Sequence, residues 1–146
     1  MHLEIAKLTE ADHASWEALF AGYNTFYRRT LPPHMIDRAW REFQADTRLH
    51  ALGAKIDGRL VGITHFLVHP NTSALDVCYL QDLFTAEAVR GQGVGGALIE
   101  AVAAWAREQG CSRLYWQTHE SNTTARRLYD RLAINDGFIV YRMPLS

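Results

Sequence analysis

The fold of this chain is decided by the stretch Val-Arg-Gly-Gln-Gly-Val-Gly-Gly-Ala-Leu at residues 89–98, which holds four glycines within six positions. An apolar pattern of helical period follows it without a break. Glycine adopts the backbone conformations that a tight loop needs, and the N–H groups of such a loop and of the next helical turn point toward one place. The stretch therefore predicts an anion site at a helix N-terminus, most naturally for phosphate groups.

Two common phosphate-binding loops do not fit this stretch. The loop of NTPases ends in Gly-Lys followed by Ser or Thr, whereas Gly96 is followed by alanine and leucine. A dinucleotide fingerprint is matched in its letters by Gly91, Gly93 and Gly96, but it should follow a strand directly and be followed about 20 residues later by an acid. The strand expected at residues 113–118 offers no acid before Glu120. Both interpretations are therefore set aside.

The composition is that of an ordinary globular protein, because 48% of the 146 residues are hydrophobic and 21% are charged. This length suits one domain spanning residues 1–146. A net charge of −1 leaves no basic footprint, so no nucleic-acid partner is expected. No apolar run approaches about 18 residues, and the first residues do not resemble a signal peptide. We therefore expect a cytoplasmic protein without membrane contact.

The cysteines and histidines do not predict a metal site or a disulfide. Cys78 and Cys111 are the only cysteines, and their spacing is far from Cys-x-x-Cys. The seven histidines include no His-Glu-x-x-His arrangement. His65 and His69 would share one face of a strand, but further ligands are missing, so we interpret them as plain strand residues. No metal is expected.

Hydrophobic periodicity and turn signals predict the order β-α-α-β-β-β-α-β-α-β, one mixed sheet with helices on both faces in the α/β class. The strands are expected at residues 3–8, 51–56, 60–68, 75–84, 113–118 and 137–143. The helices are expected from about residue 10 to 27, at 34–46, at 94–109 and from 122 to about 133. Thr9 with Asp12 forms an acidic capping box before the first helix, and Asp57-Gly58 is a strong hairpin signal.

The first expected helix carries a broad aromatic stripe. Its apolar residues recur at spacings of three and four, namely Trp16, Leu19, Phe20, Tyr23 and Tyr27. Such a stripe is most often part of the core. Tyr23 and Tyr27 lie nearest the helix end and carry hydroxyl groups, so lining a substrate pocket is an equally open interpretation for these two.

The segment Arg-Gly-Gln-Gly-Val-Gly at residues 90–95 resembles the acetyl-coenzyme A loop of the GNAT N-acetyltransferase superfamily, whose pattern is Arg/Gln-x-x-Gly-x-Gly/Ala. The resemblance extends over nearly the whole chain and implies a GNAT-like fold and acetyl-CoA as the acyl donor. In the family the backbone amides of this loop hold the pyrophosphate of the coenzyme. The resemblance therefore assigns coenzyme binding to Arg90, Gly91, Gln92, Gly93, Val94, Gly95 and Gly96.

Backbone groups of the preceding strand are also implicated by this resemblance. In the family that strand splays from its neighbour and leaves N–H groups free to polarise the thioester carbonyl. The residues concerned here are Leu83, Phe84 and Thr85.

The segment Asn-Thr-Thr-Ala-Arg-Arg-Leu-Tyr at residues 122–129 resembles the GNAT motif Asn-x-x-Ala-x-x-Leu-Tyr. The resemblance implies that Asn122 reaches the pantetheine arm and that Tyr129 lies near the sulfur. A tyrosine with a pKa near 10 is protonated at neutral pH and can donate a proton to a leaving thiolate. We therefore expect Tyr129 to act as the general acid.

The general base is less clearly indicated. Tyr-Leu-Gln-Asp-Leu-Phe at residues 79–84 resembles a strand of spermidine/spermine acetyltransferases and related small-amine enzymes, in which two acids stand together. Here Gln81 stands in the place of the first acid and cannot accept a proton. Asp82 remains as a catalytic candidate acting through a water, but strand alternation puts it on the side of Leu80 and Phe84, where it would be structural. Glu120 and His119, beyond the following strand, are further candidates for the base, and we group Gln81, Glu120, Tyr23 and Tyr27 as substrate-binding residues.

Together these features predict an N-acetyltransferase that moves an acetyl group from acetyl-CoA to an amine by direct attack, with a small primary amine as the favoured acceptor. One alternative is acetylation of a protein lysine or N-terminus. Another is a non-catalytic sensor of acyl-CoA, which the loss of an acid at Gln81 favours and the presence of Tyr129 disfavours. The family resemblance also implies a homodimer.

Overall fold

The computed structural model describes residues 2–146, which form five strands, four α-helices and two short 3-10 turns. The strands and helices are β1 Leu3–Lys7, α1 His13–Phe26, α2 Pro33–Ala45, β2 His50–Ile56, β3 Arg59–His69, β4 Val77–Thr85, α3 Val94–Glu108, β5 Arg113–Tyr115 and α4 Thr123–Leu132. The mixed α/β class is confirmed, and so is the order of elements as far as α4.

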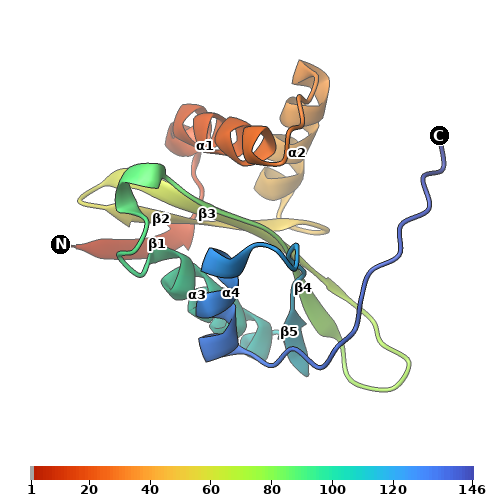
Figure 1. Cartoon of the computed structure of the whole chain (residues 1–146). Helices are drawn as coiled ribbons and strands as arrows, with labels where there is room; N and C mark the ends of the chain where they lie inside the picture. Colours follow the sequence, from red (N-terminus) through yellow and green to blue (C-terminus); the bar gives the residue numbers. More distant parts are fainter. Residues whose placement is uncertain (1) are drawn as a thin grey trace.

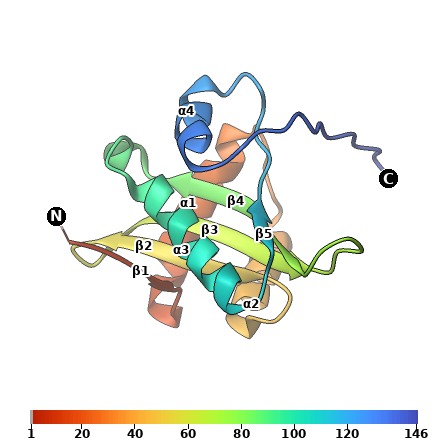
Figure 2. The same ribbon diagram turned by 90° about the horizontal axis from the view of Figure 1, so that it is seen from below.

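The strands form one sheet in the order β1-β2-β3-β4-β5. All neighbours are antiparallel except β4 and β5, which run parallel because α3 crosses over between them. Helices α1 and α2 cover one face of the sheet, and α3 and α4 lie against the other (Figure 1). The turned view shows α3 running across the sheet with α4 near the end of β4 (Figure 2).

Local signals account for the boundaries of several elements. The backbone N–H of Thr9 donates to Asp12 Oδ2 at 2.8 Å, which confirms the predicted capping box before α1. Pro33 begins α2, where its missing N–H costs nothing. Asp57 and Gly58 both have positive φ, 50° and 84°, as the tight β2–β3 turn requires.

The core has two parts, one on each face of the sheet. On the face of α1 and α2 the buried side chains include Trp16, Phe20, Trp40, Phe43 and Ile63. On the face of α3 they include Phe66, Leu80, Leu98, Ile99 and Val102. Trp16 and Phe20 confirm the core interpretation of the aromatic stripe, whereas Tyr27 is exposed at the end of α1.

The predicted closing strand at residues 137–143 is wrong, because residues 133–146 form no strand or helix. Strand β5 is also shorter than expected and ends at Tyr115 instead of residue 118. A strand exists only where its backbone groups pair with a neighbouring strand. Apolar periodicity at residues 137–143 indicates a tendency to extend, but it does not supply that neighbour.

Candidate active site

Strand β4 contains a β-bulge at Gln81. His65 of β3 pairs with Asp82, whereas the next residue, Phe66, pairs with Leu80, so that Gln81 has no partner. The bulge changes which face the following side chains occupy. Leu80 packs on the α3 face, but Asp82 lies against His65 beneath α1. The expectation that Asp82 shares a side with Leu80 is therefore wrong, because strict alternation fails at a bulge.

A chain of hydrogen bonds runs from α1 to Asp82 through His65. Trp16 Nε1 donates to His65 Nε2 at 3.0 Å, and His65 Nδ1 lies 2.8 Å from Asp82 Oδ2. An indole N–H can only donate, so His65 Nε2 must accept and the ring proton must sit on Nδ1. His65 is 1% exposed and stacks on Phe43 at 4.1 Å. This packing holds His65 as a donor aimed at the carboxylate.

Asp82 is ionised in this setting. Burial opposes its charged form, but the hydrogen bond from His65, the Tyr23 hydroxyl and the nearby charge of Arg29 together lower the pKa of the carboxyl below its ordinary value. Burial and the charge of Asp82 raise the pKa of Tyr23. Tyr23 therefore stays a phenol, and Asp82 presents a negative charge below the end of α1.

The predicted substrate residues Tyr23 and Tyr27 lie together at the C-terminal end of α1. Their ring centroids are 5.0 Å apart, and the Arg29 guanidinium lies over both rings at 5.4 and 5.2 Å. A Cβ added at Gly22 would come 3.0 Å from the ring of Phe84, so glycine allows α1 to approach β4 closely. Tyr23 is buried, whereas Tyr27 and Arg29 are exposed.

Strands β4 and β5 separate after a short parallel pairing. The pairing ends at Tyr79 and Tyr115, while β4 continues to Thr85. Beyond β4, the Ala86 N–H donates to Val61 O on β3 at 2.8 Å. Because backbone groups alternate between the two edges of a strand, the N–H groups of Leu83 and Thr85 point away from β3 into the space that β5 leaves. By the same alternation the N–H of Phe84 points toward β3, so of the three residues expected to offer free N–H groups only Leu83 and Thr85 direct theirs into this space.

The glycine loop joins the end of β4 to the start of α3. Gly91 and Gly93 have φ of 83° and 85°, which only glycine adopts readily, and Gly93 immediately precedes α3. The first internal hydrogen bond of α3 runs from Ala97 N–H to Gly93 O. The N–H groups at residues 93–96 therefore have no partner within the helix and give its N-terminus a partial positive charge. The Arg90 side chain donates to Thr85 O at 3.4 Å and its guanidinium lies 5.4 Å from the ring centroid of Phe84, while Gln92 Nε2 donates to Ala88 O at 3.4 Å.

Helix α4 lies against the first turn of α3. A Cβ atom added at Gly95 or Gly96 would lie 3.6 or 3.4 Å from the Leu128 side chain of α4, so the two helices pack closely at this point. Asn122 stands at the start of α4, and its Nδ2 donates to Thr118 Oγ1 at 3.3 Å. The two motifs of the sequence, which are about 30 residues apart, are thus neighbours in the fold.

Tyr129 lies next to Leu128 and stacks edge-on against Trp116, with ring centroids 5.4 Å apart. Burial and the proximity of the Tyr27 phenol raise the pKa of Tyr129 above its ordinary value. The phenol is therefore protonated throughout the neutral range.

The other predicted site residues lie on the surface. Gln81 is exposed at the bulge, and Glu120 is exposed in the loop before α4, where its backbone oxygen accepts from Arg126 at 2.8 Å. Cys78 is buried in β4, and burial together with Cys111 raises the pKa of its thiol to about 12. Within residues 2–146 no group of three or more His, Cys, Asp or Glu side chains could hold a metal ion.

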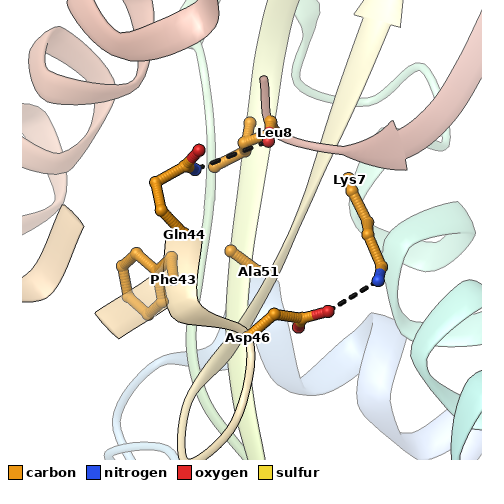
Figure 3. A pocket seen from close by; sticks show the side chains of 6 residues that line it. All are labelled: Lys7, Leu8, Phe43, Gln44, Asp46 and Ala51. Carbon is orange, nitrogen blue, oxygen red and sulfur yellow. Dashed lines mark hydrogen bonds and ion pairs between the residues drawn. The ribbon is translucent and has the colours of Figure 1, made fainter. Parts of the chain in front are cut away.

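A hollow of about 190 Å³ lies elsewhere, between the C-terminal end of α2 and strands β1 and β2 (Figure 3). Lys7 Nζ and Asp46 Oδ2 form an ion pair of 2.6 Å across its rim. None of its lining residues belongs to β4, α3 or α4. The hollow therefore plays no part in the site.

Three residues of this region were missed by sequence reasoning, namely Trp16, His65 and Arg29. The sequence predicts a core residue at Trp16 and a plain strand residue at His65, and both side chains are buried. Trp16 and His65 are 49 residues apart in the chain, and His65 and Asp82 are 17 residues apart, so no local pattern connects the three. Only the register of β3 against the bulge brings them together.

The acetyltransferase (GNAT) family model matches residues 16–133 of the chain. The D-amino-acid N-acetyltransferase of Saccharomyces cerevisiae is 30% identical over 136 residues, which cover 90% of this chain and 84% of the relative. An aminoglycoside N(6')-acetyltransferase of Serratia marcescens is 38% identical over 72 residues, 48% of this chain and 49% of that protein. The structure of ribosomal-protein-alanine N-acetyltransferase from Brucella melitensis superposes with a TM-score of 0.83 at 27% identity, covering 99% of this chain and 100% of the other.

None of the helices in residues 2–146 has both the length and the apolar character needed to cross a membrane. The family model covers most of the chain, including the glycine loop and the Asn122–Tyr129 motif. The fold agrees with this match. The chain therefore belongs to the GNAT family and is an acetyltransferase.

Proposed function

We propose that this enzyme transfers an acetyl group from acetyl-CoA to the primary amine of a small molecule. The observation that carries the proposal is the opening of β4 from β5 beyond Tyr79, beside the free N–H groups at the start of α3. The relatives named for D-amino acids and aminoglycosides support a small-molecule acceptor. We further propose that the whole of residues 1–146 serves as one catalytic domain.

The residues at the loop fit the coenzyme. The N–H groups at residues 93–96 form an anion site, and the built Cβ atoms at Gly91 and Gly93 meet nothing within 4 Å, so the loop surface is open to a ligand. We assign these amides, with Arg90, Gln92 and Asn122, to binding the coenzyme. When bound, acetyl-CoA supplies an activated acyl thioester.

The chemistry of this chain's own groups follows from their placement. We assign the N–H groups of Leu83 and Thr85 to polarising the acyl oxygen, because they point into the opening. We assign to the Tyr129 hydroxyl the donation of a proton to the departing sulfur, because its raised pKa keeps it protonated. The buried thiol of Cys78 is not needed as a nucleophile.

The acceptor site is proposed at the end of α1, where Tyr23 and Arg29 lie near the carboxylate of Asp82 and Tyr27 packs beside Tyr23. The negative charge of Asp82 attracts the ammonium form of an amine. Its lowered pKa makes it a weak proton acceptor, so we assign it the role of positioning the amine, which reacts after losing its proton to water. Gln81 and Glu120 are proposed to contact the acceptor at the surface.

The test is thiol release from acetyl-CoA by the purified protein across D- and L-amino acids, aminoglycosides, polyamines and peptides that carry lysine or an N-terminal alanine. Turnover confined to small amines is expected. Turnover confined to peptides would instead support a protein acceptor, which the resemblance to the ribosomal-protein-alanine N-acetyltransferase favours. Coenzyme binding without turnover on any amine would contradict the enzyme and indicate a sensor.

Replacing Gly93 by alanine is expected to weaken CoA binding by about tenfold or more, measured by calorimetry. Alanine at a φ of 85° is strained by about 1–2 kcal/mol, and its methyl group would project beside the proposed anion site. Gly58→Ala is the matched control, because Gly58 has a φ of 84° in the distant β2–β3 turn. If Gly93→Ala bound CoA as well as the wild type, the assignment of the loop would be wrong.

A further inference from the structure

The backbone at the C-terminal end of α1 fixes the position of Arg29. The N–H of Arg28 donates to Thr25 O at 2.9 Å. The next N–H, that of Arg29, donates to Asn24 O at 2.8 Å. These two bonds form a Schellman motif, which needs a left-handed residue directly after the helix. Arg28 takes that conformation with a φ of 57°, which is less favourable for arginine than for glycine. The chain therefore reverses there, and Arg29 lies back over the last turn of α1.

The Arg29 guanidinium is stacked but not neutralised. It lies 5.4 Å from the ring centroid of Tyr23 and 5.2 Å from that of Tyr27. Among residues 2–146 it forms no ion pair with an acidic side chain. A guanidinium is always charged, and stacking on its flat face leaves the N–H donors at its edge free. Because Arg29 is exposed, these donors are available to a ligand.

A negative group lies near this guanidinium without touching it. Asp82 is half-buried, and its Oδ2 lies 2.8 Å from His65 Nδ1. The charge of Arg29 is one of the influences that lower the pKa of Asp82, and the charge of Asp82 helps to raise the pKa of Tyr23. Opposite charges therefore flank the one phenol of Tyr23 and do not pair directly. A ligand that carries both charges matches this arrangement.

The other charges at the end of α1 disfavour an acceptor with several positive groups. The chain has no Asp or Glu between Glu17 and Asp37, whereas this stretch contains both Arg28 and Arg29. A polyamine or an aminoglycoside would bring additional ammonium groups beside two arginines, and unpaired like charges oppose binding. A zwitterion adds one charge of each sign and avoids this repulsion.

We propose that the acceptor is a free α-amino acid, whose carboxylate binds the Arg29 guanidinium while its amine lies at Asp82. The inference rests on the proposed function, which places the acceptor amine beside that carboxylate. Arginine binds carboxylates through two parallel N–H···O bonds, so Arg29 orients the acceptor as well as holding it. A single carbon joins the two charged groups of an α-amino acid, which suits protein charges that flank one ring.

Thiol release from acetyl-CoA is measured with alanine, leucine and phenylalanine, each as the free acid and as its amide, in both enantiomers. The wild type is expected to prefer the free acids. Arg29→Gln should lower kcat/KM for the free acids by about 10- to 100-fold, mainly through KM, because it removes a charged hydrogen-bonding partner. The amides should change by less than about threefold. Arg29→Lys keeps the charge but not the planar fork, so it should recover only part of the loss.

Arg28→Asn is the matched control. It removes a neighbouring positive charge, and asparagine tolerates the left-handed conformation at this position. The Arg29 guanidinium lies over the two tyrosine rings, so this variant keeps the stacked group. It should retain the wild-type preference for free acids over amides. Circular dichroism verifies that all variants fold.

Direct binding separates this inference from the proposed function. Calorimetry follows the same amino acids binding to the protein saturated with CoA. If no amine is acetylated, the proposed function fails, and binding that Arg29→Gln weakens would still support the inference. Absence of binding in that case, or binding that ignores the substitution, would overturn it. If amines are acetylated, the inference is wrong where amides react as well as free acids, or where Arg29→Gln slows both equally or neither.

Discussion

Replacing Tyr129 by phenylalanine is expected to lower kcat by about 10²- to 10⁴-fold and to leave the Kd for CoA nearly unchanged. The substitution removes one hydroxyl from a half-buried ring and keeps its packing against Trp116. It therefore removes the proposed proton donor and keeps the ring surface that we expect to lie beside the coenzyme. Steady-state thiol release and calorimetry with CoA measure the two quantities.

Tyr79→Phe is the matched control, because Tyr79 lies on β4 before the strands separate and should keep the wild-type kcat. The pH profile adds a second readout. Because the pKa of Tyr129 is raised, the wild-type kcat should not decline from loss of this proton until above about pH 10. An unchanged kcat in the phenylalanine variant, with normal folding, would remove Tyr129 from the mechanism.

Replacing His65 by leucine is expected to destabilise the protein by about 3–5 kcal/mol at pH 7. The substitution keeps an apolar contact with Phe43 but leaves the Trp16 N–H and the Asp82 carboxylate without their shared partner. An ionised carboxylate that is mostly buried cannot recover this interaction from water. Unfolding in urea, followed by tryptophan fluorescence, measures the loss of free energy.

The effect should depend on pH in a defined direction. In the wild type the pKa of Asp82 is lowered on folding, so its contribution to stability is present above about pH 4 and is lost as pH falls through the folded value. In the His65→Leu variant burial is expected to raise that pKa instead. The gap between the two proteins should therefore be largest at neutral pH and narrow below about pH 4.

The double variant H65L/D82L provides the control for this interpretation. With no carboxylate left to bury, it should be more stable than the sum of the two single substitutions predicts. Strictly additive losses, or a gap between His65→Leu and the wild type that does not change with pH, would show that His65 contributes by packing alone.

Much of the fold was predictable because its signals are local. The capping box at Thr9, the Asp57-Gly58 turn and the apolar face of α3 each need only a few neighbouring residues, and the structure contains all three. The spacing of residue types along the chain also indicated the glycine loop and the Asn122–Tyr129 motif. What it did not predict was the packing of Leu128 against Gly95 and Gly96, because that contact joins two separate helices.

The residue pattern was enough to identify the family, and it predicted the glycine loop at the start of α3 and the tyrosine that we propose as the proton donor. These depend on residue types at short spacings, where backbone geometry leaves little choice. Three features could be seen only in the folded chain, namely the side on which Asp82 lies, its link to Trp16 through His65, and the absence of the expected closing strand. A β-bulge and a strand's pairing partner both depend on how distant segments pair with each other. The free energy of that pairing depends on both segments, so it cannot be inferred from one segment alone.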